Sequence, residues 1–242
     1  MGGLFKKKDP PPDDEDPVWR ATYDAREKLY ERHFGPFPQD VQKLRNLMDV
    51  WPGGCLIQFP ATKLGSLWVH SSFGLSNSDM PNSVTLESYK KDEARGTSEA
   101  TLVARTPRPV PAGLAGFGYE ILVVTEGPGQ WPLRFLNWVV QREILKDLDV
   151  LGCVNKNEGL LIEDIALGDG QSSHFFVSRA REPLPAILQL PAGNCHLLVA
   201  SAVTREEVDF TLLEGSGAPL LEKLMASEIG QKSRLNRPSI PL

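Results

Sequence analysis

The chain has 242 residues, of which 41% are hydrophobic and 24% charged, as is ordinary for a globular protein with a buried core. Its 26 Lys and Arg residues against 31 Asp and Glu residues give a formal net charge of −5. Nucleic-acid-binding proteins need a basic face to displace counterions, so this charge argues against that class and we expect no nucleic-acid partner.

Sequence signals for membranes and secretion are also missing. The longest apolar runs, such as Leu197–Val203, are far shorter than the roughly 20 residues that span a bilayer. No apolar stretch follows the basic residues Lys6–Lys8, so no signal peptide is predicted. The three cysteines are widely spaced and form no CxxC pair, which predicts neither a zinc knuckle nor a redox dithiol. We therefore expect a cytoplasmic protein with no membrane partner.

Composition divides the chain into three parts. Residues 1–17 alternate between basic, Pro-rich and acidic stretches, which predicts a flexible N-terminal arm. Residues 18–230 carry the periodic apolar patterns of one domain. Residues 231–242 are polar and contain prolines, which predicts a mobile C-terminal tail.

Two helices are predicted at the start of the domain. The first covers residues 18–34, where aromatic residues recur near one face, and Gly35-Pro36 ends it. The second covers residues 39–50, because Val41, Leu44 and Met48 repeat at helical spacing.

Five strands are then predicted, over residues 55–59, 66–72, 84–88, 100–105 and 117–125. The last of these is apolar on both faces except at Glu120, as in a strand covered on both sides. A lone charge in such a strand is costly to bury, so we expect Glu120 to meet a cationic or N–H partner, inside the domain or across an interface.

The second half of the domain begins with a helix near Pro132, followed by strands over residues 160–166, 174–178 and 196–203. The third of these strands is nearly all apolar, so we place it centrally. Thr204 and Glu207 form a capping-box pattern that starts a short helix, and a final helix is predicted over residues 218–229. The fold class is therefore mixed α/β (α+β), with a central, mostly antiparallel sheet and helices packed against it.

Catalytic patterns are scarce. The sequence has no GxGxxG, GxxxxGK[ST], HExxH or GxSxG motif. His70, His174 and His196 fall on different predicted strands, and only with Glu163 or Glu120 would they make a metal site, which no spacing fixes. We expect no metal, no cofactor and no enzymatic activity.

Four short motifs resemble the suppressor-of-fused family. His70–Ser76 (HSSFGLS) resembles its H-x-x-S-x-G-[LM]-S strand and turn, and Gly116–Glu120 (GFGYE) stands where the family has G-[FW]-G-[FY]-E-L. Gln130–Pro132 (QWP) resembles the start of its W-P helix. Pro191–Gly193 (PAG) and Val203–Glu207 (VTREE) resemble its closing segment. The motifs keep the order and spacing of the family over nearly all of the predicted domain.

The resemblance implies a suppressor-of-fused-like domain that binds another protein without catalysis. In animal relatives this domain joins a second one and clamps an extended peptide of Gli-type transcription factors, which adds as a strand. Because the chain ends after the first domain, as bacterial relatives do, we expect a bacterial member and no Hedgehog role. Bacterial relatives are often immunity proteins of toxin–antitoxin type, so the resemblance implies a polymorphic toxin as the protein partner.

A contact surface follows from the strand and turn that carry the first motif, together with the neighbouring strand. Its expected members are His70, Ser72, Asn77, Asp79, Met80, Tyr119 and Glu120. Here the acid that often follows the family's glycine turn is displaced to Asp79, which makes the partner of this chain differ if the turn is a contact site. Two alternatives stay open: a metal-dependent hydrolase that uses His70 and His174 with a nearby carboxylate, and a scaffold protein tethered by its N-terminal arm.

Overall fold

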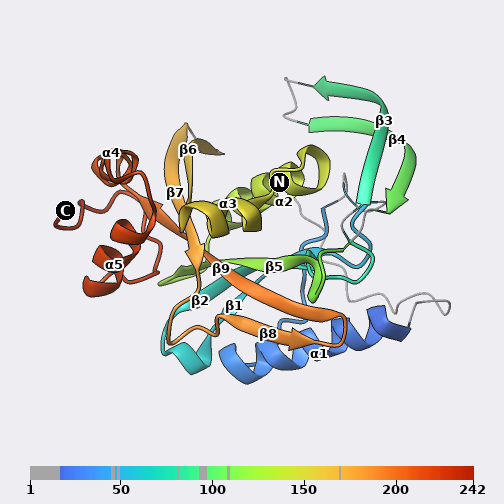
Figure 1. The fold of residues 1–242 in the computed structure, drawn as a ribbon, viewed down its shortest axis with the longest axis horizontal. Coiled ribbons are helices and arrows are strands. Elements are labelled where there is room, and N and C mark those ends of the chain that lie inside the picture. Colours follow the sequence, from blue (N-terminus) through green and yellow to red (C-terminus); the bar gives the residue numbers. More distant parts are fainter. Residues whose placement is uncertain are drawn as a thin grey trace.

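The computed structural model describes residues 17–44, 47, 50–80, 82–92, 97–107, 110–168 and 170–242, with the backbone alone for 82–92 and 97–107. The elements are α1 (Pro17–Phe34), β1 (Cys55–Pro60), the 3-10 helix η2 (Thr62–Leu64), β2 (Trp68–Phe73), β3 (Asn82–Asp92), β4 (Thr97–Pro107), β5 (Leu114–Thr125), α2 (Gln130–Lys146), α3 (Val150–Asn157), β6 (Leu160–Gly168), β7 (Gln171–Arg179), β8 (Ile187–Leu190), β9 (Gly193–Val203), α4 (Arg205–Glu214) and α5 (Ala218–Ala226) (Figure 1).

A seven-stranded sheet forms the centre of the fold. Its strands lie in the order β1-β2-β5-β9-β7-β6, and β8 also pairs with β9. The pairing of β5 with β9 is parallel, and the other pairings in this sheet are antiparallel. The predicted class, helices packed on a mostly antiparallel sheet, is confirmed. The apolar strand expected to be central is β9, which has neighbours on both edges.

Helices cover both faces of the sheet. Figure 1 shows α1 on one face, α2 and α3 over the other, and α4 and α5 at one end. Along β5 the side chains alternate, with Tyr119, Ile121 and Val123 in the core beneath α2 and α3 and Leu122 and Val124 in the core beneath α1. Glu120, between Tyr119 and Ile121, therefore points toward α1.

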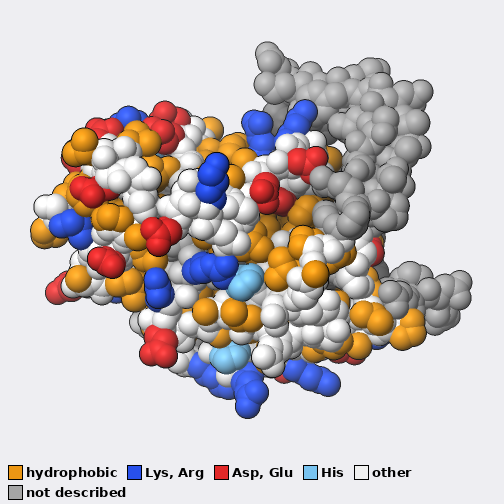
Figure 2. All heavy atoms as spheres, in the orientation of Figure 1, with side chains coloured by type: hydrophobic (Ala, Val, Ile, Leu, Met, Phe, Trp, Pro, Cys, Tyr) orange, Lys and Arg blue, Asp and Glu red, His pale blue; other side chains and the backbone are white. Residues whose placement is uncertain are grey.

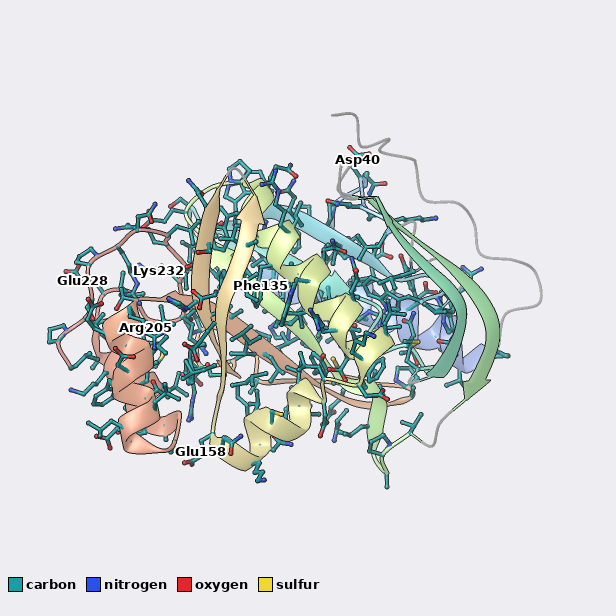
Figure 3. All side chains as sticks on the ribbon, turned by 90° about the horizontal axis from the view of Figure 1, so that it is seen from above. Asp40, Phe135, Glu158, Arg205, Glu228 and Lys232 are labelled. Carbon is teal, nitrogen blue, oxygen red and sulfur yellow. The ribbon has the colours of Figure 1, made fainter. Side chains whose placement is uncertain are left out.

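Each core is closed by aromatic packing. Under α2, Phe135, which is labelled in Figure 3, stacks on Phe175 of β7 with ring centroids 4.0 Å apart. Under α1, Tyr30 meets Phe73 edge-to-face at 5.4 Å. A third, smaller core joins Phe176 of β7 to α4 and α5. The capping box predicted at Thr204 and Glu207 is confirmed at the start of α4.

The helix predicted over residues 39–50 is wrong where the structure describes that segment. Gln42 instead pairs with Leu56 of the edge strand β1 through two backbone hydrogen bonds of 2.8 Å. Val41 and Leu44 are still buried, as their spacing indicated. Pairing with an exposed strand edge overrode a weak helical preference, since propensity alone contributes little per residue.

Helix α3 and strand β8 were not expected. Helix α3 continues to Asn157, and its C-cap, Glu158, adopts φ = 57°. The Asp149 side chain caps this eight-residue helix by accepting the N–H of Gly152. A glycine inside a short helix hides the apolar period that would otherwise reveal it.

The C-terminal segment 231–242, which was predicted to be a mobile tail, makes buried contacts with the domain in this structure. The Ser233 hydroxyl donates to the Ala200 carbonyl at 2.9 Å and accepts from the Ala202 N–H at 2.7 Å. Arg237 forms a buried ion pair with Glu207 of α4 at 2.6 Å. Polar residues that suggested a solvated tail instead satisfy backbone and charged groups at the end of the sheet.

Two further expectations concern the ends and the membrane. The predicted N-terminal arm lies outside the described residues except for Pro17, which begins α1. None of the helices in the described part of the chain combines the length and apolarity that crossing a bilayer requires.

Candidate functional site

Two of the four motifs meet in a buried polar cluster centred on Glu120. One of its carboxylate oxygens accepts the Ser72 hydroxyl at 2.6 Å. The other accepts the Gly74 N–H at 2.8 Å and, from Ser76, both the N–H at 3.0 Å and the hydroxyl at 2.7 Å. Four donors thus surround a carboxylate with no exposed surface. The predicted N–H partner of Glu120 is found inside the domain.

The cationic partner of Glu120 is Arg26 of α1, whose guanidinium lies 3.5 Å from the carboxylate. Arg26 is itself fully buried and donates to the Ser76 hydroxyl and to Asn77 Oδ1, each at 2.7 Å. Its guanidinium carbon also lies 4.2 Å from the centroid of the Phe73 ring. The arginine therefore ties α1 to the turn after β2 as well as to β5. We call Arg26, Ser72, Ser76, Asn77 and Glu120 the Glu120 cluster.

Glycines let the turn and the two strands approach closely enough to make this cluster. Gly74 has φ = 132° and donates its N–H to Glu120. Gly116 has φ = 58°, and a Cβ there would lie 2.4 Å from the Leu75 carbonyl oxygen. Only glycine fits such a left-handed position pressed against backbone. The motif glycines thus serve the internal fold of the turn.

The seven residues expected to form a contact surface do not form one in this structure. Six are buried, and Asp79 is half-buried. Ser72, Asn77 and Glu120 meet around Arg26, whereas Tyr119 and Met80 lie in the core beneath α2 and α3. His70 lies apart, with Nε2 2.8 Å from Thr125 Oγ1. The physical reason is the cost of the Glu120 charge, which draws the polar turn inward to supply donors.

Arg26 was not predicted, although the sequence carries a signal for it. It lies between Thr22 and Tyr30 at successive four-residue steps, and all three residues are buried against the sheet. A single cation on the apolar face of a helix and a single anion in an apolar strand are each costly to bury alone. The sequence alone shows both the buried cation, Arg26, and the buried anion, Glu120. The expectation that each needs a counter-charge would have predicted their contact.

The strand histidines do not converge on one site. Arg179 donates to His196 Nδ1 at 2.6 Å, and His174 Nδ1 accepts the Asp164 N–H at 3.2 Å. Burial lowers the pKa of His70 to about 4, so its ring is neutral. These histidines serve local bonds on β2, β7 and β9.

One group of potential metal ligands occurs among the described residues: Glu163, Asp164 and His174. Glu163 is already paired with Arg205 of α4 at 2.7 Å, and both side chains are largely exposed. His174 Nδ1, which lies 3.7 Å from Asp164 Oδ1, accepts a backbone N–H. Its potential ligands are therefore engaged in ordinary surface contacts, and the group supplies no specific support for a metal-dependent hydrolase.

The arrangement of the sheet and its helices is similar to that of solved structures. One, from "the Sufu-Fu complex crystal structure", aligns with a TM-score of 0.53 at 17% identity over 93% of this chain and 92% of that chain. The chain has a suppressor-of-fused-like fold. Drosophila suppressor of fused aligns with a TM-score of 0.52 at 16% identity, over 92% of this chain and 51% of its own. No family model and no curated protein sequence matches the chain.

Proposed function

We propose that this chain is a protein-binding domain of the suppressor-of-fused type that acts without catalysis. The observation that carries the proposal is the Glu120 cluster, in which the motif residues hold the turn after β2 against α1 and β5. The Glu120 carboxylate accepts four internal donors and has no exposed surface, so its role is to shape the domain. The fold is also that of a suppressor-of-fused structure determined in a complex.

A more specific role is the neutralisation of a toxin in the cytoplasm of a bacterium. The resemblance of the four motifs to bacterial suppressor-of-fused-like immunity proteins motivates this role. The net charge of −5 supports it, since an acidic protein associates faster with a basic partner such as many nucleases. Electrostatic attraction of this kind raises the association rate more than the final affinity.

Capture and reconstitution test the proposal. The tagged protein is isolated from its own cells, and a co-purifying polypeptide is then produced separately and mixed with it. We expect a complex of fixed stoichiometry by size-exclusion chromatography with light scattering. For the toxin role, we expect the partner to stop cell growth when expressed alone and growth to resume when this chain is co-expressed.

The controls separate binding from catalysis. If the partner elutes from the column in complex with this chain and its mass is unchanged, the chain is a stoichiometric binder. If trace amounts of this chain convert the partner to a product, the chain is an enzyme. If no polypeptide remains bound after reconstitution, the protein-binding proposal fails. If a partner binds but has no effect on growth, the toxin role alone fails.

A further inference from the structure

Two neighbouring pockets lie along one face of α5. The first has a volume of ≈ 450 Å³ and is lined by Ala218, Leu221 and Glu222 of this helix. The second, of ≈ 280 Å³, is lined by Met225. These positions are i, i+3, i+4 and i+7, so they form one stripe along the helix. From Ala218 to Met225 the stripe is about 10 Å long. Arg181 lines both pockets, so they lie next to each other, and we call the two together the α5 groove.

The first pocket contains a positioned cation. Arg179 donates to His196 Nδ1 at 2.6 Å and to Asn155 Oδ1 at 2.5 Å, so its guanidinium is held by two neutral acceptors. Burial and the neighbouring Arg179 lower the pKa of His196, which keeps that ring uncharged. Among the described residues, no carboxylate lies within 4.0 Å of the Arg179 or Arg181 guanidinium. Two positive charges therefore face the groove without a counter-charge in direct contact.

Carboxylates at the rim restrict which anion fits. Glu158 and Glu222 also line the first pocket, and Glu158 accepts the Ser216 hydroxyl at 2.9 Å. They repel a phosphate dianion or a nucleic-acid backbone more strongly than a single carboxylate. Figure 2 shows this mixed character, with basic side chains and a histidine close together over the centre of the face and acidic side chains toward α5.

The second pocket is lined mainly by apolar side chains. Leu67, Val124, Leu184 and Ile229 surround it together with Met225, a residue that is 38% exposed. An unbranched thioether at the mouth of an apolar pocket adapts to side chains of different shape. Figure 3 labels Glu158, beside the first pocket at the end of α3, and Glu228 and Lys232, which border the second.

We infer that the α5 groove binds an extended segment of the partner protein that carries an Asp or Glu and, three residues away, a large apolar side chain. The acid meets Arg179 and Arg181 in the first pocket, and the apolar side chain enters the second. Three residues of extended chain span about 10 Å, which matches the stripe along α5. This inference rests on the proposed protein-binding function and specifies the chemistry of the partner.

Selection from a library of random twelve-residue peptides displayed on phage tests the inference, with the folded chain as bait. We expect the recovered peptides to share an acid and a Leu, Ile, Phe or Met three positions apart. A synthetic copy of the best peptide, with blocked ends and a fluorescent label, is then titrated by fluorescence polarisation. We expect Arg181→Gln to weaken its binding about fivefold to tenfold, in the range of partly exposed charge pairs.

The controls distinguish this groove from general charge effects. Arg32→Gln removes another exposed arginine, on α1, and should leave the affinity within about twofold. The amide form of the peptide's acid should bind the wild type as weakly as the acid form binds Arg181→Gln, and combining both changes should add little. Met225→Gln should weaken binding by disturbing the apolar pocket.

Three outcomes would overturn the inference: recovery of no peptide, recovery of peptides without an acid, or equal binding to Arg181→Gln and the wild type. The fate of the native partner separates this failure from that of the proposed function. If the reconstituted partner still binds Arg181→Gln with full affinity, protein binding stands and the groove is excluded. If no partner is found at all, the protein-binding function itself fails.

Discussion

Replacing Glu120 with glutamine tests whether the cluster stabilises the domain through its charge. The glutamine side chain has nearly the same shape and keeps one acceptor oxygen, but it leaves the Arg26 guanidinium buried without a counter-charge. Removal of one partner from a buried ion pair costs about 3–5 kcal/mol, most of it from the uncompensated charge. Domains have only about 5–15 kcal/mol of total stability, so we expect a soluble but much less stable variant.

The matched control is the exposed pair between Glu163 and Arg205, which is as short as 2.7 Å but largely solvated. Glu163→Gln should change the free energy of unfolding by no more than about 0.5 kcal/mol. The double variant Glu120→Gln/Arg26→Met removes both buried charges and should recover part of the loss. Urea unfolding followed by circular dichroism and tryptophan fluorescence measures the wild type and all three variants. A loss below about 1 kcal/mol for Glu120→Gln, or a double variant no better than the single one, would refute the reasoning.

Three further predictions concern other parts of the domain. Burial lowers the pKa of His70 to about 4, so below pH 6.5 the unfolded chain binds more protons than the folded one. The free energy of unfolding therefore keeps its full value above that pH and falls by about 3 kcal/mol as the pH drops to 4. Urea midpoints across this range should fall less steeply for His70→Gln than for the wild type. Arg237→Gln should lower the free energy of unfolding, measured by urea, by about 3–5 kcal/mol, because Glu207 loses its buried partner. Deletion of the exposed residues 241–242 is the control and should leave this free energy nearly unchanged. The Thr204 hydroxyl accepts the Glu207 N–H at the start of α4, so Thr204→Ala should cost about 1 kcal/mol of stability and lower the thermal midpoint. An unchanged midpoint would exclude a contribution from this cap.

The sequence predicted the helices and strands whose local apolar pattern matches the face that they bury in the folded domain. The run of apolar residues in β9 is extended and buried because it lies between strands on both edges. The buried residues of α2 recur at helical spacing in the sequence, so the pattern predicts the helix directly. The stretch 39–44 failed because its apolar spacing fits a helix equally well, while the free edge of β1 at Leu56 supplied better backbone partners. No local pattern contains that information.

The tail and the expected contact residues both turn inward for a related reason. Polar residues near a chain end suggest solvent, yet Ser233 and Arg237 replace water as partners for buried groups of β9 and α4. In the same way, the polar turn after β2 suggested a contact surface, yet it folds inward around Glu120. Composition shows that a polar group needs a partner but does not show whether water or the protein supplies it.

The location of the Glu120 cluster explains how a fold can be recognised from motifs that do not identify a partner. Gly74, Gly116 and Glu120 are required because the turn must approach backbone closely and a buried carboxylate must find donors. These demands come from inside the domain and are the same whatever binds outside it. If the α5 groove binds the partner as inferred above, partner choice depends instead on exposed side chains such as Arg181 and Met225, which take no part in these internal contacts. Substitutions along that groove can therefore redirect binding while the cluster and the fold stay unchanged.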